Sequence, residues 1–285
     1  MDHYKQISFG ASKIITKAYS TSFSLGIMAF TPKYREPIYG IYGFVRIADE
    51  IVDTFHGFDK EKLLADFKKD TMYAIENGIS VNPVINAFQK TIRDYKIDIA
   101  LVEAFLESMR MDIFKSTYEA NQYNEYIFGS AEAVGLMCLK VFVDGDENEY
   151  NRLKYSAKAL GSAFQKVNFL RDIKSDLDER GRIYLPDAVN NEDITDINKQ
   201  NLEKEIENEF NIALEGIKQL PAGVKLGVYS AYLYYRKLFD KIKEKEVKQL
   251  LKKRIRVSNF RKVVLLLKSF LEVKILKTCQ VKNSI

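Results

Sequence analysis

Apolar residues recur at three- and four-residue intervals along most of the chain, and this period predicts helices. In the segment 37–55, one apolar stripe consists of Ile41, Val45, Ala48 and Val52. Such a stripe lets a helix pack one face against a core, and Pro37 suits its first turn because no intrahelical N–H donor is needed there. Segments 59–77 and 101–118 repeat the amphipathic pattern. The pattern predicts an all-α protein.

One polar, turn-rich stretch, 178–193, interrupts the helical pattern and is the best candidate for a long loop or flap. The chain contains no linker long enough to separate two domains. It also shows no fixed repeat with a period of about 20 to 50 residues, which disfavours a solenoid. We therefore expect one all-helical domain over residues 1–285.

The segment 37–55 also carries a polar stripe, which we call the first ladder. Its members, at offsets of 0, 4, 7 and 11 residues, are Tyr42, Arg46, Asp49 and Asp53. Asp49 and Asp53 are one helical turn apart, so their like charges repel each other unless a cation compensates them. Ion pairing on the protein surface is the alternative explanation for this stripe when it is taken alone.

A second ladder lies in the stretch QKVNFLRDIKSD. Its members, at offsets of 0, 3, 7 and 11 residues, are Gln165, Asn168, Asp172 and Asp176. Carboxylate and amide oxygens suit a hard cation such as Mg²⁺, with Mn²⁺ as an alternative, and Mg²⁺ usually binds together with substrate phosphates. Two such ladders on facing helices predict a site for a diphosphate.

Further residues distinguish this interpretation from a di-iron site. The arginines that could pair with phosphate oxygens are Arg46, Arg171, Arg254 and Arg256. A di-iron bundle needs a Glu-x-x-His motif from each of two helices. The chain contains only His3 and His56, and neither is near the second ladder in the sequence, which disfavours the di-iron interpretation.

The composition changes this picture little. A net charge of +5 is too weak to indicate nucleic acid, but it is compatible with an anionic ligand or an anionic membrane surface. Cys138 and Cys279 are expected to be small buried apolar residues. No run reaches the roughly 18 apolar residues of a membrane span, and the start lacks the apolar core of a secretory signal. We expect a cytoplasmic protein whose basic region 236–282 contacts the inner face of the membrane.

At this point the sequence resembles the squalene/phytoene synthases, which join two prenyl diphosphates head to head. The resemblance extends from YSTSFSLG (19–26) to RIRVS (254–258). YGFVRIADEIVD (42–53) and QKVNFLRDIKSD (165–176) look like the two aspartate-rich motifs of the family, and GRIYLP (181–186) is similar to the segment that follows the second. The chain departs from the family pattern at four positions, namely Thr21, Phe128, Glu132 and Ser175.

The resemblance implies a fold and a set of site residues. The fold would be a single helical bundle of the isoprenoid-synthase type around a deep apolar cavity. The metal-binding residues would be Asp49, Asp53, Asn168, Asp172 and Asp176, and the four aspartates with Tyr42 and Arg46 would be catalytic. The substrate contacts would be Ser22, Phe23, Tyr42, Arg46, Gln165, Asn168, Arg171, Tyr234 and Arg254.

The implied reaction is a Mg²⁺-dependent condensation of two geranylgeranyl diphosphates to phytoene, with the loop 178–193 excluding water. Dehydrosqualene or squalene formation from farnesyl diphosphate is the nearest alternative. We expect no NADPH requirement, because the chain has no G-x-G-x-x-G fingerprint. The alternatives of other classes are a terpene cyclase, which Asn168, Arg171 and Asp172 disfavour, and a non-catalytic protein of membrane surfaces, which leaves both ladders unexplained.

Overall fold

The computed structural model describes residues 2–185, 188 and 193–282, apart from the side chains of residues 21, 22, 259 and 274–282. Within this part every regular element is a helix, which confirms the predicted all-α class. The elements in chain order are α1 (Asp2–Tyr19), α2 (Thr21–Met28), α3 (Pro32–Asp53), α4 (Lys60–Asn77), α5 (Pro83–Asp94), α6 (Ile99–Phe114), α7 (Ala120–Ile127), η1 (Phe128–Glu132), α8 (Ala133–Phe142), α9 (Glu147–Arg180), α10 (Asp196–Gln219), α11 (Ala222–Lys243), α12 (Val247–Leu250) and α13 (Asn259–Lys282).

Helix α3 begins earlier than the sequence predicted. Pro32, not Pro37, occupies its first turn, and Thr31 is the N-cap residue. Pro37 therefore lies inside the helix, where it is buried and where its missing N–H removes one backbone hydrogen bond. The predicted apolar stripe is buried as expected, so burial along the rest of α3 offsets the loss of that bond.

The other predicted boundaries are close to those observed. Helix α4 covers nearly all of segment 59–77, whereas α6 ends at Phe114, four residues before the end of the predicted segment 101–118. Helix α9 continues to Arg180, so the expected loop 178–193 begins only at Gly181, which has a left-handed φ of 63°. Residues 186–187 and 189–192 of that loop lie outside the described residues.

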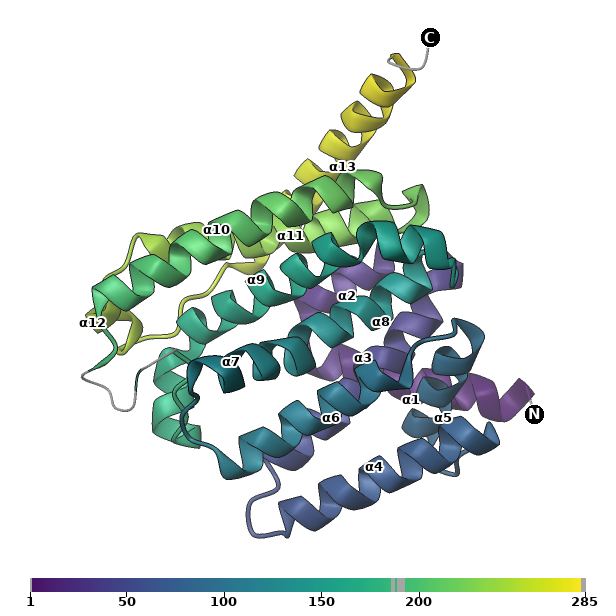
Figure 1. Ribbon diagram of the computed structural model, residues 1–285. Helices are drawn as coiled ribbons and strands as arrows, with labels where there is room; N and C mark the ends of the chain where they lie inside the picture. The colour runs from purple at the N-terminus through teal and green to yellow at the C-terminus, as the bar shows by residue number, and fades with distance from the viewer. Residues whose placement is uncertain (1, 186–187, 189–192, 283–285) are drawn as a thin grey trace.

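The helices pack around α9, which is 34 residues long. Helix α9 lies against α8 on one side and α10 on the other, and α11 also contacts it (Figure 1). Helix α3 packs against α1, α5 and α8. A stack of fully buried aromatic rings, in which the Phe44 and Phe88 centroids are 3.8 Å apart, fills the core where α3 meets α5. Helices α3 and α9, which carry the two ladders, are thus held by packing over most of their lengths.

A π-helical turn joins α7 to α8 without a break, and the sequence did not predict it. The two helices pack in different surroundings. Tyr123 and Tyr126 of α7 belong to an aromatic cluster with Tyr184, whereas α8 packs in the main core. Gly129 in the turn lies against α6, and a Cβ atom there would be 2.3 Å from the Ala104 carbonyl oxygen. The turn therefore requires glycine at this crossing.

Helix α13 packs along α11 and then extends away from the other helices toward the C-terminus (Figure 1). Its contacts with α11 include a hydrogen bond from Tyr229 to Glu272 at 2.8 Å and one between Ser230 and Ser269 at 2.6 Å. In the described part of the chain, neither α13 nor any other helix is long and apolar enough to cross a bilayer.

The helix crossing at Gly129 can be tested by a matched pair of substitutions. We expect Gly129→Ala to lower the free energy of unfolding by about 1–3 kcal/mol, because the added methyl group overlaps α6. Gly10→Ala should instead raise it by about 0.5–1 kcal/mol, since Gly10 lies inside α1 and a Cβ there meets no atom within 4 Å. Urea unfolding followed by far-ultraviolet circular dichroism measures both. Equal effects of the two substitutions would contradict the close packing at Gly129.

Candidate active site

A deep cavity of about 470 Å³ lies between α2, α3, α8, α9, α10 and α11. Along α9 its wall runs from Leu153 through Leu160 and Phe164 to Asn168 and Arg171. The sixteen residues from Leu153 to Asn168 span about 22 Å of helix. Apolar side chains line the deep end and polar ones line the other end, which we call the mouth. The cavity therefore suits a ligand with a long apolar chain and a charged head.

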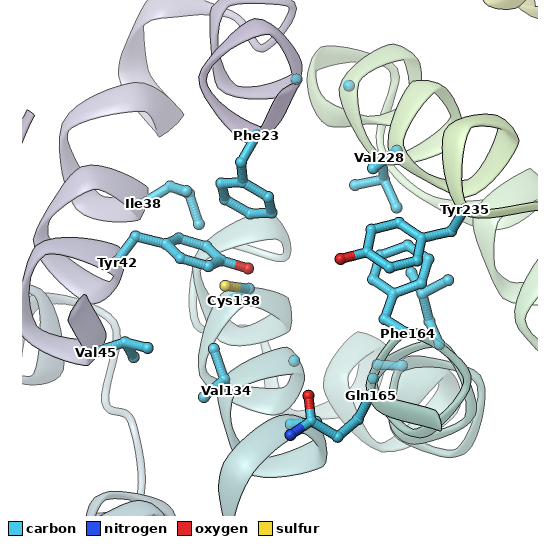
Figure 2. Close-up of a pocket in the computed structure, with 18 of the residues that line it drawn as sticks. Phe23, Ile38, Tyr42, Val45, Val134, Cys138, Phe164, Gln165, Val228 and Tyr235 are labelled. Carbon is cyan, nitrogen blue, oxygen red and sulfur yellow. The ribbon is translucent and has the colours of Figure 1, made fainter. Parts of the chain in front are cut away.

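Two aromatic walls face each other across the middle of the cavity (Figure 2). Tyr42 of α3 lies on one side, stacked with Phe23 at a centroid distance of 3.8 Å. Tyr235 of α11 lies on the other side, stacked with Phe164 of α9 at 3.9 Å. Burial raises the pKa of Tyr42 well above its ordinary value, so this side chain is a neutral phenol, and its hydroxyl lies near the buried Cys138 side chain (Figure 2).

The first ladder runs along α3 from the aromatic wall to the mouth. Its Arg46 Nη1 donates to Asp49 Oδ2 at 2.5 Å. The Arg46 Nε atom is buried and has no hydrogen-bond partner among the described residues. A buried donor without a partner is costly, so Arg46 has unused capacity for an anionic oxygen.

The second ladder runs along α9 toward the same mouth. Gln165 donates to Ser130 at 3.2 Å, and Asn168 accepts a hydrogen bond from the Tyr235 hydroxyl at 3.2 Å. Asp172 pairs with the neighbouring Arg171 and with Arg254, whose Nε lies 2.7 Å from Asp172 Oδ1. Because Arg254 follows α12, the C-terminal part of the chain also closes on the mouth.

The two ladders meet at the end of the mouth through Arg180. Its Nε is 3.4 Å from Asp53 Oδ2 of the first ladder, and its Nη1 is 3.0 Å from Asp176 Oδ1 of the second. Oxygen atoms from both ladders thus converge on one cationic group. A hard cation that binds together with a diphosphate fits this donor set.

The local electrostatics reflect the crowding of carboxylates. Burial is the main cause that raises the pKa of Asp49 to about 6, and burial followed by repulsion from Asp172 raises that of Asp176 to about 7. Both values exceed the ordinary value of about 4. The contribution of these groups to stability is therefore lost as the pH rises through these values and the carboxylates ionise.

The described residues contain no group of three or more His, Cys, Asp or Glu residues that could hold a metal ion by themselves. The carboxylates of the ladders are instead paired with arginines. Any divalent cation at this mouth would therefore share its coordination with water or with oxygens of a bound diphosphate.

Most of the sequence-predicted substrate contacts line the cavity, namely Phe23, Tyr42, Arg46, Gln165, Asn168, Arg171 and Arg254, together with Asp49. Asp53, Asp172 and Asp176 are not in this lining. Asp172 pairs with the lining residues Arg171 and Arg254, and Asp53 and Asp176 share Arg180. Tyr234 is not in the lining, and the adjacent Tyr235 takes that place. Arg256 is exposed, and the side chain of Ser22 lies outside the described part.

Two of the positions where the chain departs from the family pattern, Phe128 and Glu132, do not obstruct the cavity. Glu132 turns to Lys158, with their charged atoms 3.1 Å apart, and Lys158 lies over the Phe128 ring. Neither Phe128 nor Glu132 belongs to the cavity lining, whereas the intervening Ala131 does. Cys138 is buried in the lining, as expected, and the side chain of Cys279 lies outside the described part.

Sequence reasoning missed a buried network behind the mouth. Asp112 of α6 accepts hydrogen bonds from the tyrosines Tyr118, Tyr126 and Tyr184 at 2.7, 2.8 and 2.9 Å. Arg182 lies 3.7 Å from Asp112 and 2.8 Å from Asp53. The available signal was Asp112 itself, a carboxylate on the same face of α6 as the apolar Leu101 and Phe105, since a buried charge needs partners.

Comparisons with known proteins agree with this geometry. The Squalene/phytoene synthase family profile matches residues 16–261. The chloroplastic phytoene synthase 2 of Solanum lycopersicum is 32% identical over 247 residues, which cover 79% of this chain and 77% of that protein. The chloroplastic phytoene synthase 1 of the same species is 30% identical over 269 residues, covering 87% of this chain but only 64% of that protein.

A solved structure shows the same fold. The crystal structure of a dehydrosqualene synthase in complex with a ligand superposes with a TM-score of 0.79 at 24% identity, covering 95% of this chain and 98% of that one. The family profile extends from the end of α1 into α13 and so includes both ladders and every wall of the cavity. The chain belongs to the squalene/phytoene synthase family.

Proposed function

We propose that the protein is a phytoene synthase, which condenses two geranylgeranyl diphosphates head to head with the help of Mg²⁺. The observation that carries this proposal is the convergence of two carboxylate ladders at the mouth of one long apolar cavity. Members of the family are prenyltransferases, and they use prenyl diphosphates with a divalent metal. The names of the curated relatives favour the longer, geranylgeranyl substrate.

The ladders supply the ligands for the metal in this proposal. Mg²⁺, or Mn²⁺ in its place, would be held by Asp49, Asp53, Asn168, Asp172 and Asp176. When bound, the metal would withdraw charge from the diphosphate and so stabilise it as a leaving group.

Arginines at the mouth bind the remaining phosphate oxygens. Arg46 has a buried Nε without a partner, and Arg171 and Arg254 already lie together on Asp172. A guanidinium presents several donors in a fixed plane, which matches the oxygens of a phosphate. The substrate head therefore lies between α3, α9 and the segment after α12, and the prenyl chains extend toward Leu153.

The reaction breaks one allylic C–O bond first, which releases diphosphate and leaves an allylic cation. The double bond of the second substrate attacks this cation, and loss of a proton closes a cyclopropyl-carbinyl diphosphate. A second ionisation releases the other diphosphate, and rearrangement with loss of a second proton gives phytoene with a central conjugated triene. The faces of Phe23, Tyr42 and Tyr235 can stabilise the cationic carbons, since aromatic rings attract cations without bonding to them. The apolar walls exclude water, which would capture the cations.

We also propose that α13 rests on an anionic membrane surface. Its exposed large apolar residues among those described follow helical spacing and are Phe260, Val263, Val264, Leu267, Phe270 and Leu271. Arg261 and Lys268 beside them supply the charge that an anionic lipid surface attracts. Helix α13 packs on α11, which also lines the cavity, so this contact would bring the hydrocarbon product close to lipid.

The product identifies the substrate length. We expect the purified protein with Mg²⁺ to convert geranylgeranyl diphosphate to phytoene whether or not NADPH is added, as detected by mass spectrometry and the absorbance of the triene. If the protein instead makes dehydrosqualene, and only from farnesyl diphosphate, the mechanism stands but the substrate is the shorter one. If it makes squalene only when NADPH is present, the reaction also includes a reduction. Cyclic hydrocarbons from one substrate would show a terpene cyclase.

Replacing one ladder carboxylate tests the site. We expect Asp49→Asn to lower kcat/KM by roughly a hundredfold or more, because it removes a charge that must face the metal and the leaving group. The control is Asp94→Asn, which changes an exposed carboxylate paired with Lys90 on α5. Unchanged turnover in Asp49→Asn, with circular dichroism showing an intact fold, would rule out the metal assignment.

Vesicle binding tests α13. The protein should co-sediment with vesicles of phosphatidylcholine containing 30% phosphatidylglycerol as a chosen composition, and less with phosphatidylcholine alone. Leu267→Glu should weaken binding about tenfold or more, because it places a charge on a side chain that is 61% exposed in the apolar stripe. Val81→Glu, at a 98% exposed position before α5, is the control. Equal vesicle binding by both variants would contradict the proposal. So would a wild-type protein that is a dimer and that Leu267→Glu converts to a monomer, because the apolar stripe would then be a dimer interface.

A further inference from the structure

Two arginines flank the end of α9, and both reach Asp53 of the first ladder. Arg182 Nη1 lies 2.8 Å from Asp53 Oδ1, and Arg180 Nε lies 3.4 Å from Asp53 Oδ2. Gly181 between them ends the helix in a left-handed conformation, which allows the two side chains to approach the same carboxylate from different directions. Their other contacts differ.

Arg182 is held in place from behind. It is only 7% exposed and lies 3.7 Å from the buried Asp112, which three tyrosine hydroxyls fix on α6. The backbone beside it is tied as well, because the Ile183 N–H donates to the Ser116 carbonyl at 2.8 Å. A buried guanidinium with a buried counter-ion cannot leave without exposing an uncompensated charge. Arg182 is thus a fixed part of the wall.

Arg180 has no comparable anchor among the described residues. Its side chain is 30% exposed, and its ion pairs are with Asp53 and Asp176, one carboxylate from each ladder. A single guanidinium therefore neutralises the two carboxylates that face each other across the mouth. This is the position at which a cation shared by the ladders would lie.

We propose that Arg180 takes the place of the divalent cation between the ladders in the metal-free protein and withdraws when the metal binds. Arg182 stays on Asp53 Oδ1 in both states and keeps Oδ2 directed toward the second ladder, so it is a positioning residue. This inference rests on the proposed metal-dependent function. The two arginines then have opposite effects on metal affinity, because Arg180 competes with the metal for Asp53 and Asp176, whereas Arg182 orients Asp53 toward it.

Metal binding without substrate distinguishes the two roles. The probe is Mn²⁺, with and without inorganic diphosphate, and free Mn²⁺ is measured by electron paramagnetic resonance on the full chain. Arg180→Gln should bind Mn²⁺ about fivefold more tightly than the wild type, because no side chain has to be displaced. Arg182→Gln and Asp112→Asn should bind it about tenfold more weakly, as expected when a partner that orients a metal ligand is lost. Arg110→Gln, in an exposed pair with Glu107 on α6, is the control and should not differ from the wild type.

Thermal unfolding gives a second measurement, and it does not depend on catalytic activity. Arg180→Gln should have a lower Tm than the wild type without metal, because Asp53 and Asp176 then repel each other, and the same Tm at saturating Mn²⁺ with diphosphate. Arg182→Gln should remain below the wild type in both conditions. If Arg180→Gln does not fold, Arg180→Lys replaces it. The lysine ammonium is a single charge on a shorter side chain without the guanidinium fork, so it bridges the two carboxylates less well and should give an affinity for Mn²⁺ tighter than that of the wild type.

The outcomes separate this inference from the function on which it rests. If Arg180→Gln, or Arg180→Lys in its place, binds Mn²⁺ no more tightly than the wild type, the placeholder role of Arg180 is wrong although the metal site stands. A Tm deficit of Arg180→Gln that persists at saturating metal leads to the same conclusion. If the wild type binds no Mn²⁺ even with diphosphate, the proposed metal-dependent function is wrong, and the role of Arg180 that rests on it is wrong as well.

Discussion

Neutralising the carboxylates at the mouth of the cavity is the constraint on which the site depends. Four aspartates of the two ladders and Asp112 behind them lie close enough to repel one another, and burial removes the water that would screen them. Each is paired with an arginine, and these arginines come from α3, α9, the segment after α9 and the segment after α12. The charges thus draw distant parts of the chain to one end of the cavity.

Packing provides the rigidity that this charge cluster requires. The ladders lie on α3 and α9, whose opposite faces are buried in the core. Close packing there fixes the backbone of both helices, so the carboxylates cannot move apart by a shift of the helices. Close helix crossings contribute as well. At Gly227 of α11, a Cβ atom would be 2.4 Å from the Gly26 carbonyl oxygen of α2, so α2 and α11 approach closely at the deep end of the cavity. The site can therefore concentrate charge at one end without collapse at the other.

The sequence predicted the elements and residues whose signals are local. Apolar spacing revealed α3, α4 and α6, and the spacing of carboxylates revealed both ladders, because helical periodicity depends only on neighbours within a few turns. The start of α3 was misplaced because Pro32 and Pro37 both suit a first turn, and the choice depends on packing. Arg182 could not be assigned, because its partner Asp53 is 129 residues away along the chain. Tyr234 and Tyr235 differ only in which way each points from α11, and that is set by the rotation of the helix against α9.

The π-helical turn between α7 and α8 sets the phase of one continuous helical run. It adds a residue to one turn, so the sequence spacing between Tyr126 of α7, which faces the aromatic cluster around Tyr184, and Val134 and Cys138 of α8, which line the cavity, is one residue longer than in an uninterrupted α-helix. Deleting one residue from Phe128–Glu132 would restore ordinary α-helical winding, and because the wide turn absorbs that one extra residue, α8 would keep its orientation relative to α7. In evolutionary terms, the turn is a place where the chain can gain or lose one residue while the cavity wall formed by α8 stays where it is.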